Sequence, residues 1–157
     1  MGSIKPRLRA LLDAEQAAAS AMSQMADSAT AAGVRVCLRG LHDTATWLSD
    51  GLAKRIARAT KRRSTSTHTV AGLTDQLMIA PADADRLRLL NRHQRSVLAR
   101  VDRLLLERID VDLRTFLQEA HGVLARSVAQ CDEAIAGLDR EREVHRESDA
   151  STPGRSL

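Results

Sequence analysis

Aromatic side chains are nearly missing from this chain of 157 residues: Trp47 and Phe116 are the only two, and tyrosine does not occur. Strand-rich folds depend on aromatic and β-branched side chains, so this shortage argues against them. Proline is also scarce, with three residues, all at positions that suit helix starts or tails. Alanine, leucine, arginine and glutamate dominate instead, which predicts an all-α protein.

Cysteine is equally scarce. Cys37 and Cys131 both fall on otherwise apolar helical faces, and we interpret them as small buried hydrophobic residues. A disulfide needs an oxidising compartment, and no secretory signal precedes the first expected helix. No run of about 18 apolar residues occurs either, which excludes a membrane-spanning helix. We therefore expect a cytoplasmic protein.

Four segments show the apolar periodicity of amphipathic helices. The first covers Ile4 to Ser28 and the second Ala31 to Lys61, while the third begins near Pro81. The fourth begins at Asp110 or Asp112, either of which can act as an N-cap. Apolar residues recur in alternating steps of three and four, which is typical of helices that pack at a shallow angle.

The connections between these helices differ in length. Hairpin-length segments join the first helix to the second and the third to the fourth, whereas Arg62 to Ala82 separate the second from the third. A connection of that length can cross the bundle, so we expect the second and third helices to run parallel, as in the ferritin-like arrangement. We predict one bundle domain over residues 1–140 and a charged, disordered tail over residues 141–157.

Polar residues interrupt the apolar stripes at inward positions. Glu15, Gln94 and His121 do so on the first, third and fourth helices, and the second helix offers Thr44 beside Ala45. We predict that Glu15, Thr44, Gln94 and His121 form a buried polar cluster. Such clusters can fix the register of packed helices.

The same positions suggest a metal centre, because carboxylate-bridged metal pairs in bundles use inward side chains from all four helices. Glu15 and His121 are the matching ligands, and Gln118 stands where a Glu-x-x-His motif needs its carboxylate. Two metal ions need several anionic oxygens, so we expect no cofactor. The alternative is a reduced iron or manganese site that uses Glu15 and His121. No complete catalytic set is visible, which leaves enzymatic activity undecided.

Positive charge gathers at the end of the second expected helix, in a basic patch without an acid among its residues. Such a run can bind phosphates by counterion release, but no aromatic residue is interleaved to stack a base. Cations also suit the end of a helix. We therefore do not expect nucleic acid as a partner, and docking on an anionic surface stays open as a third hypothesis. The patch comprises Lys54, Arg55, Arg58, Lys61, Arg62 and Arg63.

Four short segments carry a family resemblance. They are Leu11 to Glu15, Met78 to Asp83, Leu89 to Gln94 and Glu119 to His121, and together they resemble motifs of a small bacterial ferritin-like family of uncharacterised function. The resemblance is strongest over residues 72–135. Where relatives tend to carry an Asp-Glu pair in the second helix, this chain has Asp43 and Thr44.

The resemblance implies a ferritin-like four-helix bundle, and the departure at Asp43 and Thr44 argues against a metal site inherited with it. From it and from the residues, we predict a non-enzymatic binding or structural module with a degenerate metal site. Its expected partner is a second copy of the chain or another protein. A carboxylate-type metal protein is the alternative.

Overall fold

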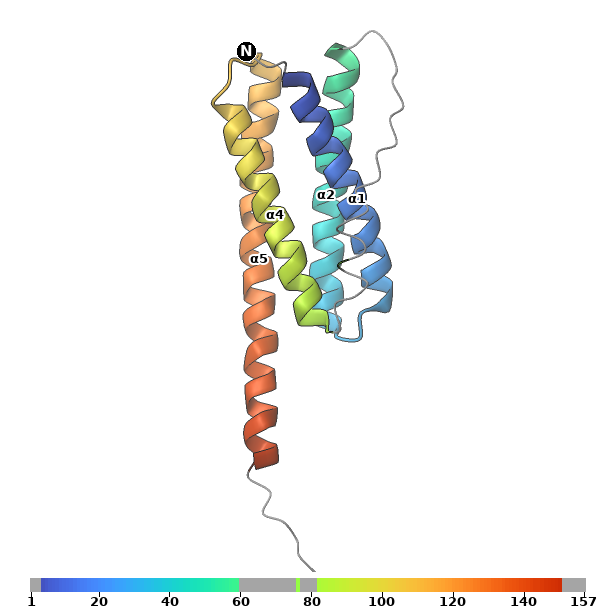
Figure 1. Cartoon of the computed structure of the whole chain (residues 1–157), viewed down its shortest axis with the longest axis vertical. Helices are drawn as coiled ribbons and strands as arrows, with labels where there is room; N and C mark the ends of the chain where they lie inside the picture. The colour runs from blue at the N-terminus through green and yellow to red at the C-terminus, as the bar shows by residue number, and fades with distance from the viewer. Residues whose placement is uncertain (1–3, 60–75, 77–81, 151–157) are drawn as a thin grey trace, which may run out of the picture.

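The described part of the chain consists of helices and the turns between them. The computed structural model describes residues 4–59, 76 and 82–150. Its helices are α1 (Ile4–Ser28), α2 (Ala32–Ala59), α4 (Asp83–Leu105) and α5 (Val111–Ala150), and no residue in these ranges forms a strand. The prediction of an all-α four-helix protein is confirmed (Figure 1).

Contacts at both ends of the molecule show which way the helices run. At one end, Thr30 Oγ1 in the α1–α2 turn donates a hydrogen bond to Asp83 Oδ2 at the start of α4, at 3.3 Å. At the opposite end, Arg55 Nε on α2 lies 3.1 Å from Asp112 Oδ2 at the start of α5. Hence α2 and α4 run parallel, as predicted, and α1 and α5 run the other way (Figure 1). Most of the connection predicted to cross the bundle, residues 62–82, lies outside the described residues.

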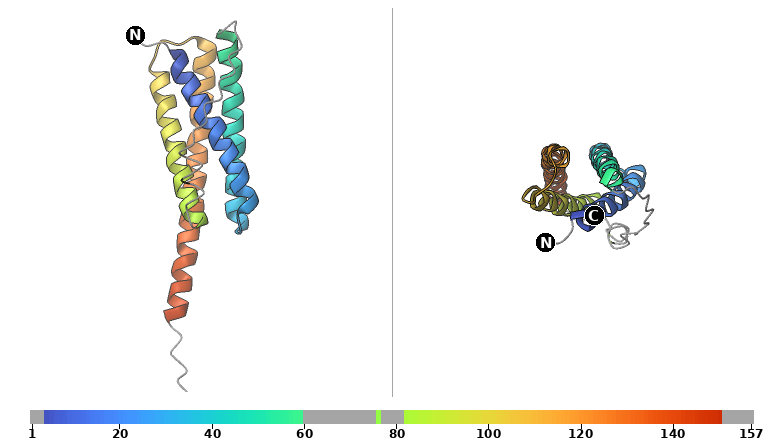
Figure 2. Two further views of the ribbon diagram at one scale, coloured as in Figure 1. Left: turned by 45° about the vertical axis from the view of Figure 1, so that its right-hand side comes forward. Right: turned by 90° about the horizontal axis from the view of Figure 1, so that it is seen from above.

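The most extensive helix contacts are within two hairpins, α1 with α2 and α4 with α5 (Figure 2). An arginine closes each hairpin from the fourth position of its second helix. Arg35 Nη2 donates to the Ala29 carbonyl at 2.9 Å, and Arg114 Nη1 donates to the Leu105 carbonyl at 2.9 Å. Carbonyls at the end of a helix lack partners within that helix, so each guanidinium satisfies one of them.

The start of α5 is capped by a side chain. Asp110 Oδ1 accepts a hydrogen bond from the Leu113 backbone N–H at 2.8 Å. This is the geometry of an N-cap, so Asp110 is the cap and not Asp112.

The two hairpins bury equivalent positions. Arg114 follows Arg35 by 79 residues, and the same shift carries most buried positions of the first hairpin onto buried positions of the second. The first helices match as Leu8 to Leu87, Leu11 to Leu90, Glu15 to Gln94, Ala18 to Val97 and Met22 to Val101. The second helices match as Val34 to Leu113, Leu38 to Leu117, Leu41 to Ala120, Ala45 to Leu124 and Leu52 to Cys131. The bundle is therefore two hairpins of one register packed together.

The interior holds two apolar clusters, one toward each end. The cluster nearer the α1–α2 turn includes Ala18, Met22, Leu38, Leu41, Leu87, Leu90 and Cys131. The cluster nearer the α4–α5 turn includes Leu11, Leu48, Leu52, Val97, Val101, Leu117 and Leu124. Each fully buried leucine contributes about 1.5–3 kcal/mol of transfer free energy, so these clusters supply the main stabilisation of the fold.

Helix α5 extends past the rest of the bundle (Figure 1). It has 40 residues, against 28 in α2, the next longest. Every residue from 141 to 150 is helical and exposed. The expectation of a disordered tail from residue 141 is therefore wrong as far as Ala150, and residues 151–157 lie outside the described residues. Arginine and glutamate favour helix without burial, which explains a helix that has no apolar stripe.

Gly51 lets an aromatic ring approach the backbone of α2. A Cβ at Gly51 would lie 2.3 Å from two ring atoms of Phe116. The ring is held on its other sides by Trp47, at a centroid distance of 5.3 Å, and by the Arg55 guanidinium, 4.1 Å from the ring centroid. It therefore has little room to move aside.

We expect Gly51→Ala to lower the free energy of unfolding by about 1–3 kcal/mol, because the new methyl group displaces Phe116. Gly40→Ala is the matched control, since a Cβ there meets nothing within 4 Å. In that variant the better helix propensity of alanine should raise the free energy of unfolding by about 0.5–1 kcal/mol. Urea unfolding of both variants measures the difference. Equal effects of the same sign would show that Phe116 does not pack on Gly51.

Candidate functional site

Glu15 lies at the centre of the bundle. It follows Leu11 and precedes Ala18 on the inward face of α1, and its side chain is fully buried. His93 Nε2 on α4 lies 3.0 Å from Glu15 Oε1. A carboxylate accepts hydrogen bonds, so the ring N–H on Nε2 is the donor. This bond joins the first hairpin to the second.

Gln94, the neighbour of His93, is also fully buried and points inward. Neither its Oε1 nor its Nε2 has a hydrogen-bond partner among the described residues, and the same holds for Glu15 Oε2. A buried polar atom without a partner costs about 1–3 kcal/mol. These three buried atoms are therefore free to form hydrogen bonds that no described residue supplies.

Glu15 and Gln94 form a polar level between the two apolar clusters. On α1, Glu15 separates Leu11 of one cluster from Ala18 of the other. On α4, Gln94 separates Leu90 from Val97 in the same way. Both residues belong to the buried polar cluster that the sequence predicts, and both are fully buried at this level.

His121 does not join this level. Its side chain is 42% exposed, and its Nε2 lies 3.0 Å from Asp102 Oδ1 on α4. The inward position on α5 belongs instead to Ala120, which is fully buried. From Leu117, a step of three leads to Ala120 and a step of four leads to His121, and both steps fit a helical stripe. The helix is turned so that the apolar residue, Ala120, is the buried one. The prediction that His121 lies in the interior is therefore wrong.

Thr44 is also displaced from the predicted cluster. It is half-buried, and its neighbour Ala45 takes the fully buried position on α2. The histidine that does reach Glu15 is His93, which the sequence analysis missed as a member of the cluster. His93 lies beside the seam of α4 and reaches sideways to α1, so the apolar stripe of its own helix gave no signal for it.

The polar level does not fit a metal pair. It offers one carboxylate, from Glu15, and one imidazole, from His93, whereas two metal ions need several anionic oxygens. The predicted ligands Glu15 and His121 are not brought together. Within residues 4–59 and 82–150, no group of three or more His, Cys, Asp or Glu side chains could hold a metal ion.

The described part of the basic patch contacts α5. Arg55 and Arg58 both pair with the carboxylate of Asp112, at 3.1 and 3.8 Å. Arg55 also stacks on the ring of Phe116. These contacts neutralise part of the charge and clamp the end of α2 to the start of α5. Of the other patch residues, Lys54 is exposed, and Lys61, Arg62 and Arg63 lie outside the described residues.

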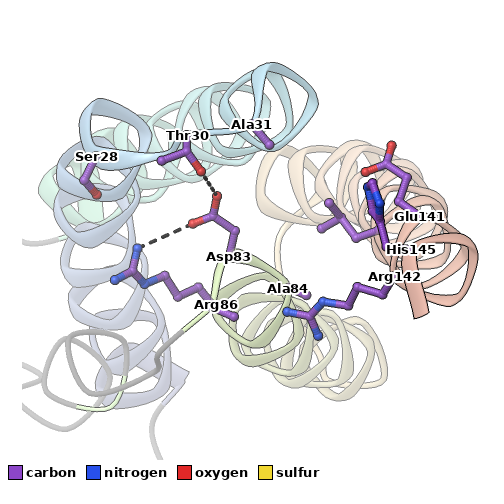
Figure 3. A pocket seen from close by; sticks show the side chains of 11 residues that line it. Ser28, Thr30, Ala31, Asp83, Ala84, Arg86, Glu141, Arg142 and His145 are labelled. Carbon is purple, nitrogen blue, oxygen red and sulfur yellow. Dashed lines mark hydrogen bonds and ion pairs between the residues drawn. The ribbon is translucent and has the colours of Figure 1, made fainter. Parts of the chain in front are cut away.

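A hollow of about 450 Å³ lies at the end of the bundle where α5 projects. The start of α4 lines one side and α5 the other (Figure 3). Asp83 is held within it by Thr30, at 3.3 Å, and by Arg86, at 3.5 Å. Arg142 and His145 face the hollow from α5 (Figure 3). Opposite charges therefore line this end of the molecule, where the free length of α5 begins.

Comparisons with known proteins give no match: no family model fits the chain, and no curated protein or solved structure matches it significantly. The resemblance to a ferritin-like family therefore stays a prediction. Among the described helices, none is both long enough and apolar enough to cross a membrane.

The hydrogen bond between Glu15 and His93 can be tested by a double-mutant cycle. We expect Glu15→Leu and His93→Leu each to lower the free energy of unfolding by about 2–4 kcal/mol, because each leaves its partner buried and unpaired. The double variant should cost less than the sum of the two single variants, since no lone charge remains. Urea unfolding at one pH gives all three values.

The exposed pair of His121 and Asp102 supplies the control for this cycle. His121→Leu should change the free energy of unfolding by no more than about 0.5 kcal/mol, as is usual for an exposed ion pair. Additive effects of Glu15→Leu and His93→Leu would contradict the bond between them.

Proposed function

We propose that this chain is a non-enzymatic, ferritin-like four-helix bundle with a degenerate metal site, and that it self-associates through the exposed length of α5. The parallel course of α2 and α4 supports the ferritin-like arrangement. The donor set around Glu15 supports a degenerate site, because one carboxylate and one imidazole are too few for a metal pair. The proposal assigns no resident cofactor.

The proposal of self-association rests on one face of α5, where the exposed side chain of Val144 lies next to a hollow at Gly137. Val144 is 61% exposed, and it is the large exposed apolar side chain on the projecting part of α5 among the described residues. Two turns before it, Gly137 opens a hollow of about 350 Å³, which Val144 lines together with Arg140, Glu141 and His145. A Cβ at Gly137 would meet nothing within 4 Å.

This face is complementary to itself. When two α5 helices pair in antiparallel fashion, Val144 of each copy can lie at the level of the Gly137 hollow of the other. In the same register, Arg140 of each copy lies opposite Glu141 of the other, so opposite charges meet on both sides. A two-fold symmetric interface needs this kind of self-complementary patch.

The length of the projecting helix also favours a partner. The last residue of α5 that packs against the core is Leu138, and the residues beyond it extend to Ala150. A helix of this length gains little stability in water by itself, so packing against a second helix would stabilise it. One helix face offers a small area, which suits a weak, transient association.

The polar level supports a second candidate, a single iron or manganese ion bound by side-chain oxygens of Glu15 and Gln94. The specific observation is the unused bonding capacity of Glu15 Oε2 and Gln94 Oε1. Oxygen ligands suit both metals. Elemental analysis of protein purified from iron- and manganese-supplemented medium decides between the two candidates. A stoichiometric ion that Glu15→Gln removes would favour the metal protein.

Self-association predicts a dimer of the full chain by sedimentation equilibrium at about 100 micromolar, within the range of weak interfaces. Val144→Lys should return the protein to the monomer, because it places a charge at the centre of the proposed interface. Leu106→Lys is the matched control, since Leu106 is 88% exposed and lies at the opposite end of the bundle. This variant should remain dimeric.

A charge exchange tests the register of the proposed dimer. Arg140→Glu should weaken the dimer by placing acids opposite each other, and adding Glu141→Arg should restore it. A wild-type protein that stays monomeric at every concentration, or a dimer that Val144→Lys leaves intact, would rule out association through this face of α5.

A further inference from the structure

The two cysteines meet between the hairpins. Cys37 on α2 packs against the apolar cluster that contains the fully buried Cys131 of α5. Both carry free thiols, and Cys37 lies in a groove beside Gln130 and Ala134, which flank Cys131 on α5. Cys131 Sγ also lies 3.7 Å from the backbone carbonyl of Leu87 on α4. The two thiols thus belong to one apolar cluster at the boundary between the two hairpins.

We propose that Cys37 and Cys131 form a reversible thiol–disulfide pair that cross-links α2 to α5 when the protein meets a hydroperoxide. The sequence pattern indicated two small buried hydrophobic residues. In the structure the two residues differ in burial: Cys131 is fully buried, whereas Cys37 is only half-buried.

Cys37 is open to small oxidants through a groove between α2 and α5. The groove has a volume of about 340 Å³, and Cys37 lies within it beside Ser127, Gln130 and Ala134 of α5. Gly33 and Gly40 border Cys37 along α2, and a Cβ at either position would meet nothing within 4 Å. The glycines therefore keep the approach to the Cys37 sulfur wide.

The surroundings give the two thiols different roles. The hydrogen bond from Cys131 lowers the pKa of Cys37, against the opposing effect of burial. The same bond and burial raise the pKa of Cys131. A thiolate is the nucleophile in thiol chemistry, and Cys37 borders the groove whereas Cys131 is fully buried. Cys37 is therefore the residue that attacks, and Cys131 is the residue that resolves the intermediate.

The chemistry needs one hydroperoxide for each disulfide. The Cys37 thiolate attacks the peroxide, the O–O bond breaks, and Cys37 becomes a sulfenic acid while hydroxide leaves and takes up a proton as water. The Cys131 sulfur then attacks the Cys37 sulfur, loses its proton, and displaces a second water as the S–S bond forms. Two electrons pass from the thiols to the peroxide. A dithiol reductant reverses the step by exchange.

The cross-link would join the two hairpins covalently. Cys131 follows Cys37 by 94 residues, so the bond closes a long loop and restricts the unfolded chain strongly. We therefore expect the oxidised protein to unfold at a temperature about 10 °C above that of the reduced protein.

The test treats the full chain with limiting hydrogen peroxide and then alkylates the remaining thiols under denaturing conditions. Mass spectrometry should find two alkyl groups on the reduced protein, none on the oxidised monomer, and two again after treatment with dithiothreitol. Calorimetry of the same samples should show the rise in unfolding temperature. Cys37→Ser removes the attacking thiol and should abolish both changes, and Cys131→Ala should leave Cys37 as a stable sulfenic acid.

Three results would overturn the proposal. One is oxidation of Cys37 to higher acids in the wild-type protein without loss of the Cys131 thiol. Another is a disulfide found between two chains instead of within one. The third is an intramolecular disulfide that leaves the unfolding temperature unchanged, which would show that the bond does not join the folded hairpins.

Discussion

A carboxylate buried at the centre of an apolar core sets the main constraint on this fold. Glu15 is fully buried, and it bonds to a histidine on another helix, His93. Contacts between α1 and α4 are few compared with those inside each hairpin. Loss of this pairing would leave a charge stranded in the interior, so the bond strongly favours one height of the first hairpin against the second. The apolar clusters on either side provide most of the stability but little of this specificity.

Contacts between α2 and α5 complete the join between the hairpins. Near the α4–α5 turn, Arg55 lies between the Phe116 ring and the Asp112 carboxylate. Toward the opposite end, Cys37 packs against the cluster that contains Cys131. The polar level, the contacts of Arg55 with α5 and the two cysteines thus all lie along the boundary between the two hairpins. A change in any of them therefore affects the packing between the hairpins more than the structure of either hairpin alone.

The sequence predicted the fold well where burial decides structure. The bounds of α1 were expected at Ile4 and Ser28 and are found there, because its apolar stripe runs the full length of the helix. The parallel course of α2 and α4 followed from the length of the connection. Helical periodicity fixes a face only to within one position, and this is why His121 was assigned to the interior instead of Ala120. The projecting end of α5 was missed because charged residues form that helix by local propensity, without an apolar stripe to reveal it.

The shared burial register of the two hairpins has a consequence for the polar level. A symmetric pair of separate hairpins would have to carry the same residue at both equivalent sites, with either two carboxylates or two amides facing each other near the axis. Joining the hairpins in one chain frees each site to vary alone. Positions 15 and 94 can therefore hold an acid and an amide, and the like-charge repulsion that an identical pair of acids would suffer does not arise. Because the two similar hairpins belong to one chain, the interior of the bundle can be asymmetric.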